Sequence, residues 1–404
     1  MPPISFRQAA ILRLRDFRFL TLATGFNSFG MTGEQVVLGW LTLELTDSPM
    51  MVAVALALRM VPLLFMGIPA GILADQTDRR LLIQISSAGM AAASGLVGLL
   101  AVAGVLHVWH LLVLTFAAGC VRALYQAARQ TFAHDLVGAG ELVNALVVLG
   151  LSMRVGGLIG SLLTGTITAR LGAGAGFLAV AASYLASVAT QQPLNRATRQ
   201  AAVSPTPMWA SFVHFLGQLR RDRVLTALIL LTAGGEILGF SHQALLPSLA
   251  RDVLHVGADG LGVMTGARSV GGILGIVLIS GLGQARTTGA FFLGVLFVFG
   301  GSLVGLAFAP TFAWVVLILI VVNGLGSVCD ILSQSLIQLS VPSALRGRAG
   351  GAWVLAIGTG PIGQLQIGAL ASLLGVSAAF GVTGVALAAM AAAGALAFPR
   401  LRRL

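Results

Sequence analysis

The segment Gly71-Ile72-Leu73-Ala74-Asp75-Gln76-Thr77-Asp78-Arg79-Arg80 joins two long apolar stretches of the chain. Gly71 carries no side chain beyond hydrogen, so a neighbouring helix can approach it closely. Asp75 follows at the edge of the first apolar stretch, where a carboxylate can accept hydrogen bonds from a helix N-terminus. Asp78, Arg79 and Arg80 then separate this stretch from the next. The segment therefore predicts a charged turn between two helices that cross a membrane.

The rest of the chain is as apolar as these flanks. Hydrophobic residues make up 57% of its 404 positions and charged residues 9%, and the mean hydropathy is +0.95. About 20 apolar residues are needed to cross a bilayer as a helix, and we find twelve such stretches: 18–44, 50–73, 81–105, 109–132, 142–168, 172–191, 224–249, 258–281, 288–308, 312–338, 349–371 and 374–397. We predict an all-α integral membrane protein with an N-terminal half (1–191), a polar linker (192–223) and a C-terminal half (224–404).

The basic residues predict the orientation of these helices. All 24 are arginines, and the formal net charge is +11. Because long apolar stretches separate them, they form no solvated basic face of the kind that binds nucleic acid. Eighteen of them, Arg129 included, fall in cytoplasmic segments if both termini are cytoplasmic, whereas Arg170 and Arg251 fall outside. The positive-inside rule therefore predicts cytoplasmic termini and a cytoplasmic linker.

The two halves repeat part of their sequence. A shift of 209 residues places Arg59 over Arg268, and a shift of 203 places one glycine pattern over another: Gly157, Gly160 and Gly165 over Gly360, Gly363 and Gly368. Six helices in each half make this a parallel repeat about an axis along the membrane normal. We expect the repeated arginines to have a structural part, capping carbonyls or pairing across the interface between the halves.

The segment 71–80 resembles the loop signature of the major facilitator superfamily, usually Gly-x-Leu-Ala-Asp-Arg-x-Gly-Arg-Arg. Two positions differ, with Gln76 in place of Arg and Asp78 in place of Gly. The resemblance implies that Asp75 bonds to the eleventh helix and that Arg79 reaches Asp135 at the end of the fourth. A simple basic loop that sets the topology is the alternative.

Further segments look like the exporter branch of this superfamily that includes enterobactin and macrolide efflux proteins. They are Asp16–Leu20, Leu45–Pro49, Ala57–Pro62, Gln338–Pro342 and Leu345–Arg348. This resemblance implies a secondary transporter of a small organic solute. We expect no cofactor and no enzymatic activity, because the chain has neither a Gly-Lys-Ser/Thr phosphate loop nor histidines at metal-ligand spacing.

Ionisable residues inside the predicted helices are the candidate site, since charge in hydrocarbon is costly and marks cavities or pairs. The acids are Glu34, Glu236 and Asp330, and the bases are Arg59, Arg122, Arg154 and Arg268. By resemblance, the first, fourth, seventh and tenth helices line the substrate path, which implies that Glu34, Arg122, Glu236 and Asp330 face it. Asn27 lies two helical turns before Glu34 on the same face. We expect one acid to carry the proton, Glu34 first, then Asp330 and Glu236.

Two features leave alternatives open. Arg154 fits a gate as well as a structural role. The run Gly156–Gly160 partly resembles an antiporter motif, but Gly157 stands where that motif has Pro, so helix packing is the simpler interpretation.

We therefore predict a proton-driven exporter of a small amphipathic solute, monomeric and working by alternating access in the cytoplasmic (inner) membrane of a bacterium. A lipid or lysolipid flippase, a facilitative uniporter and a non-transporting sensor are the alternatives.

Overall fold

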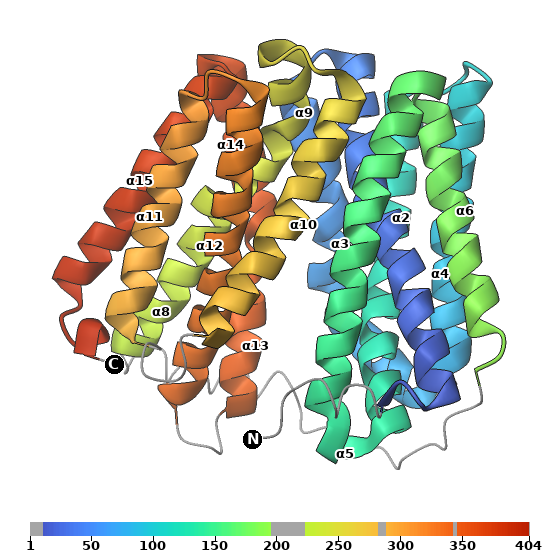
Figure 1. Cartoon of the computed structure of the whole chain (residues 1–404), viewed down its shortest axis with the longest axis horizontal. Helices are drawn as coiled ribbons and strands as arrows, with labels where there is room; N and C mark the ends of the chain where they lie inside the picture. The colour runs from blue at the N-terminus through green and yellow to red at the C-terminus, as the bar shows by residue number, and fades with distance from the viewer. Residues whose placement is uncertain (1–10, 195–222, 282–287, 342–345, 404) are drawn as a thin grey trace. The chain divides into compact units, whose positions relative to one another are not determined.

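The computed structural model describes residues 11–194, 223–281, 288–341 and 346–403, and these form helices almost throughout (Figure 1). The long helices of the first part are α2 (Arg15–Thr46), α3 (Pro49–Gln76), α4 (Arg79–Val102), α5 (Val108–Leu171) and α6 (Ala173–Gln191). Those of the second part are α8 (Arg223–Gly234), α10 (Gly257–Gly281), α11 (Gly289–Ala307), α12 (Phe312–Leu339), α13 (Arg346–Ile357), α14 (Gly360–Leu374) and α15 (Val376–Ala397). Each of the twelve predicted stretches coincides with helical structure, so the all-α prediction is confirmed.

Eleven helical segments of the described chain are long and apolar enough to cross a membrane. The remaining long helix, α2, has 32 residues and is less apolar because it buries polar side chains such as Thr24, Asn27, Ser28 and Glu34. A helix of this length spans about 48 Å at 1.5 Å per residue, which exceeds the apolar thickness of a bilayer. We therefore count α2 as the twelfth membrane helix.

Four predicted helices differ from separate, regular α-helices. The stretches 109–132 and 142–168 join in α5, which is interrupted only at Gly138, where φ is 71° and a side chain would be strained. The stretch 224–249 continues from α8 through η1 (Gly235–Gly239, π), η2 (Phe240–Leu245, 3₁₀), α9 (Leu246–Ser248) and η3 (Leu249–Val253, π). The stretch 349–371 is divided into α13 and α14 just before Pro361, which has no backbone N–H to donate.

The chain forms two compact units. Unit 1 comprises Met1–Asp47, Leu58–Ala202 and Val256–Gly266, and unit 2 comprises Ser48–Ala57, Val203–His255 and Ala267–Leu404. The first turns of α3 thus belong to unit 2, and those of α10 belong to unit 1. Within unit 1, α2 packs against α5 and α6, and α4 packs against the same two helices. The boundaries 1–191 and 224–404 of the two halves stay a prediction.

Glycines set how closely α2 approaches the second half of α5 (139–171). A methyl group on Gly160 would lie 2.7 Å from the Cα of Phe29, and one on Gly156 would lie 3.0 Å from the Cα of Gly25. The run Gly156–Gly160 therefore supports the packing interpretation. In unit 2, a methyl group on Gly363 would lie 2.6 Å from the Cα of Ile237, so the glycine repeated at a shift of 203 has the same kind of contact.

We predict that Gly160→Ala lowers the free energy of unfolding by about 1–3 kcal/mol, because the α2 backbone leaves no room for a methyl group. Gly150→Ala is the matched control on the same half of α5. Nothing lies within 4 Å of its added methyl group, so this variant should gain roughly 0.5–1 kcal/mol from helix propensity. Thermal unfolding of the purified variants in one detergent measures both changes. Equal stability of the two variants would contradict the packing argument.

Candidate functional site

A buried polar network in unit 1 surrounds the carboxylate of Glu34. Arg122 of α5 donates from Nη2 to Glu34 Oε2 at 2.6 Å, and the hydroxyl of Tyr184 on α6 donates to the same oxygen at 2.9 Å. The Nε of Arg59 on α3 lies 3.7 Å from Glu34 Oε1. Glu34 is 2% exposed, Arg122 6% and Tyr184 0%. Two guanidinium groups thus surround one carboxylate in an apolar interior.

Each partner of Glu34 comes from a different helix. The Tyr184 ring fits against α2 because Gly30, one turn before Glu34, has no side chain, and a methyl group there would lie 2.6 Å from Tyr184 Cε1. Arg59 also donates from Nη2 to the backbone oxygen of Met31. Four helices are therefore connected through one carboxylate, and a change in its charge acts on all four.

Arg59 and Arg268 correspond in the repeat, but their contacts differ. Arg59 binds the Met31 carbonyl and Glu34, both on α2. Arg268 of α10 donates from Nε to Asn323 Oδ1 on α12 at 3.3 Å. The expected capping of a carbonyl is present at Arg59. Its contact with Glu34 lies within unit 1.

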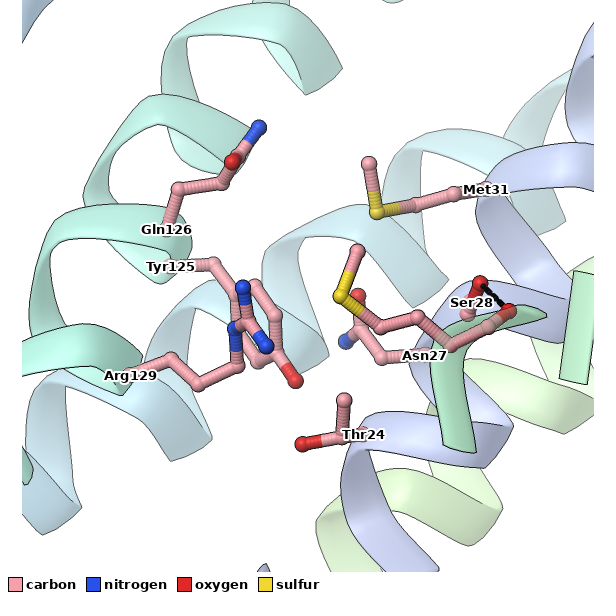
Figure 2. Close-up of a pocket in the computed structure, with 8 residues that line it drawn as sticks. Thr24, Asn27, Ser28, Met31, Tyr125, Gln126 and Arg129 are labelled. Carbon is pink, nitrogen blue, oxygen red and sulfur yellow. Dashed lines mark hydrogen bonds between the residues drawn. The ribbon is translucent and has the colours of Figure 1, made fainter. Parts of the chain in front are cut away.

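Seven residues before Glu34 on the same helix, Asn27 lines a small pocket between α2 and both halves of α5 (Figure 2). The lining residues come from two helices: Thr24, Asn27, Ser28 and Met31 from α2, and Tyr125, Gln126, Arg129 and Met153 from α5. Asn27 Nδ2 donates to Ser87 Oγ of α4 at 3.2 Å. Ser28 Oγ donates to the Met153 carbonyl at 2.6 Å.

Arg129 corrects one prediction. It was counted among the arginines of the cytoplasmic segments, but it lies on α5, is 7% exposed and lines this pocket. The spacing offered a signal, because Arg129 follows Arg122 by seven residues and so shares its helix face. Tyr184 was also missed, since nothing near it in the sequence connects it with Glu34.

The acids of unit 2 form a separate group. Glu236 lies in the π-helical turn η1, a distortion frequently found at functional sites. Asp330 of α12 lies close enough for the two partly buried carboxylates to repel each other. His242 follows in η2, fully buried, with Nδ1 2.7 Å from the Gly239 carbonyl oxygen. Arg154 lies partly buried on the second half of α5, in unit 1.

The charged turn after α3 connects the start of α4, the part of α5 just before its interruption at Gly138, and the residue that follows α6. Asp78 caps α4, accepting hydrogen bonds from the backbone N–H of Arg80 at 3.0 Å and of Leu81 at 3.5 Å. Arg79 forms an ion pair with Asp135 of α5, and Arg80 Nη2 donates to the Gln192 carbonyl beyond α6 at 2.6 Å. Gly71 and Asp75 belong to the last turns of α3, and their side-chain positions lie outside the described part of the structure.

The helices and the embedded charges define a multi-pass membrane transporter of the major facilitator type. Solved structures of a peptide transporter, POT, and of the nucleoside transporter NupG share this fold. A POT mutant matches with a TM-score of 0.78 at 14% identity, covering 96% of this chain and 95% of that one. NupG matches with a TM-score of 0.75 at 13% identity, covering 95% of this chain and 98% of that one.

More particularly, the chain belongs to the family described as transmembrane secretion effector, whose model matches residues 7–403. It is also similar to the staphyloferrin A transporter of Staphylococcus aureus (strain NCTC 8325 / PS 47). The two sequences are 24% identical over 358 residues, which cover 87% of this chain and 88% of the relative.

We predict that Arg122→Gln lowers the free energy of unfolding by about 3 kcal/mol or more, because it removes the main charge partner of a buried carboxylate. Tyr184→Phe should cost about 1–2 kcal/mol, since one hydrogen bond is lost and the ring remains. Glu44→Gln is the control, because the exposed Glu44 accepts a hydrogen bond from Trp40 Nε1 at 2.5 Å and has no further partner among the described residues. This variant should change stability by less than about 0.5 kcal/mol. Thermal unfolding of the detergent-solubilised variants measures the order of these losses in stability. A Tyr184→Phe loss larger than that of Arg122→Gln would contradict it.

Proposed function

We propose that the protein exports a small amphipathic organic solute across the bacterial cytoplasmic membrane, in exchange for protons and by alternating access. The observation that carries this proposal is Glu34, a buried carboxylate held by two guanidinium groups and one phenol from three other helices. The secretion family and the similarity to a transporter of staphyloferrin A support outward movement of an organic solute.

The proposed coupling step is the protonation of Glu34. As a carboxylate, Glu34 accepts hydrogen bonds from Arg122 and Tyr184 and compensates part of the charge of two arginines. A proton on Glu34 removes that compensation and leaves two cations facing each other in an apolar region, which is unfavourable. A local separation of the four helices then lowers the free energy, because it moves the two cations apart. Proton binding thereby favours a different arrangement of α2, α3, α5 and α6.

The proposed orientation has both termini and the linker 192–223 in the cytoplasm. Removing Arg129 from the count leaves seventeen arginines in the predicted cytoplasmic segments and two outside. The asymmetry that determines the orientation is therefore unchanged.

Glu34→Gln should abolish uphill, pH-gradient-driven transport and retain downhill exchange, because the amide keeps the shape of a protonated acid and cannot lose the proton. The measurement uses proteoliposomes and the best ligand from a thermal-shift screen of siderophores, macrolides, dyes and lysolipids. Glu44→Gln, an exposed acid on the same helix, should transport as the parent does.

Asp330→Asn and Glu236→Gln are tested in parallel, because both acids remain candidates. Concentrative, pH-dependent flux in all three neutral variants would disprove proton coupling through these residues. A uniporter would then be the better description.

For the charged turn we propose that Asp75 closes the cytoplasmic side by accepting a hydrogen bond at the cytoplasmic edge of the membrane, whereas Asp78 acts through its cap on α4. Asp75→Asn should lower transport while ligand binding largely persists. Asp78→Asn should change neither, because Asn caps helices as well as Asp does. Initial flux and equilibrium binding on the same preparations separate the two effects. Equal loss of binding and flux in Asp75→Asn would assign this residue to the cavity or the fold.

A further inference from the structure

Two levels of polar contact connect α2 with the first half of α5 (108–137), and they are seven residues apart on both helices. At one level Glu34 faces Arg122, and at the other Asn27 and Arg129 line the same pocket. Residue numbers rise along α2 as they fall along this part of α5, so the helices run antiparallel. The level of Asn27 and Arg129 therefore repeats the level of Glu34 and Arg122, with an amide in place of the carboxylate.

Arg129 has no negative partner at this lower level. It is 7% exposed, and within the described residues no carboxylate pairs with it and no acceptor takes a hydrogen bond from its guanidinium. The phenol of Tyr125 lies near enough to interact electrostatically with the Arg129 guanidinium. A buried cation without a partner is costly for folding, so the position is suited to an anion that comes from outside the chain.

The pocket around Arg129 has a polar and an apolar part. In Figure 2, Arg129 and Tyr125 extend from α5 towards Asn27 and Thr24 on α2. Asn27 Oδ1 is buried and accepts no hydrogen bond from any described residue. The thioethers of Met31 and Met153 line the same space, and methionine adapts to apolar groups of varied shape.

We infer that this pocket binds a carboxylate-bearing organic solute, with the carboxylate paired to Arg129 and the apolar part against Met31 and Met153. One planar guanidinium matches one planar carboxylate through two parallel hydrogen bonds. The single unpaired charge of the pocket selects a single anionic group. This inference rests on the proposed function, because it takes the pocket as part of the path of the exported solute, and it names the chemical class of that solute.

The test compares 4-phenylbutyrate with its uncharged amide, 4-phenylbutyramide, for binding to the full chain in lipid nanodiscs by calorimetry. The acid should bind at least about tenfold more tightly than the amide, the effect of one buried charge-assisted pair. Arg129→Gln should remove this preference. Arg170→Gln, which removes an exposed arginine at the far end of α5, should keep it.

Asn27→Asp tests the inference without removing an arginine. It places a carboxylate opposite Arg129, as Glu34 stands opposite Arg122, so the acid should lose its advantage while the melting temperature stays the same or rises. This variant decides the outcome if Arg129→Gln does not fold.

Three results would overturn the inference: equal binding of acid and amide to the parent protein, a preference that survives both Arg129→Gln and Asn27→Asp, or no binding of the acid up to its solubility limit. A failure of the inferred carboxylate binding and a failure of the proposed proton coupling give different results. An acid preference that depends on Arg129 together with flux insensitive to the pH gradient would contradict the proposed proton exchange and support the pocket. Proton-coupled flux together with equal binding of acid and amide would support the proposed proton exchange and contradict the inferred carboxylate pocket.

Discussion

The buried carboxylate of Glu34 is the interaction on which the architecture of unit 1 depends. A charge in an apolar region must be paired and hydrogen-bonded, and here the donors come from α3, α5 and α6. Their convergence requires the backbones to be close, and glycines such as Gly30 and Gly160 provide that closeness. Close packing at small residues and charge pairing are therefore both required. Neither of them by itself would place four helices around one side chain.

The same requirement separates two kinds of arginine on α5. Arg122 is satisfied by Glu34, whereas Arg129 shares its helix face and its burial but faces an amide. Where a protein keeps a costly buried charge without an internal partner, the position is a candidate for ligand binding rather than for stability. Under the proposed function, the pair of Glu34 and Arg122 would respond to protons, and Arg129 would pair with the solute.

The internal repeat is retained in the scaffold more than in the site. Gly160 packs on the backbone of α2 at Phe29, and its counterpart Gly363 packs on the backbone of η1 at Ile237. Arg59 and Arg268 also correspond in sequence, yet one contacts a carboxylate and a carbonyl and the other an asparagine. Close packing depends on backbone geometry, which symmetry preserves. Charge pairing depends on single side chains, which can differ between halves.

The sequence alone determined the twelve apolar helices, because the length and apolarity of a membrane helix are local properties. It also identified Glu34, Asn27 and Arg122, since a polar residue in an apolar stretch is conspicuous wherever it lies. Tertiary structure decided the partners. Tyr184 reaches Glu34 across 150 positions of the chain, and Arg129 proved to be a buried pocket residue rather than a cytoplasmic charge. Local composition cannot assign such roles, because burial and pairing depend on which helix faces arrive from distant parts of the chain.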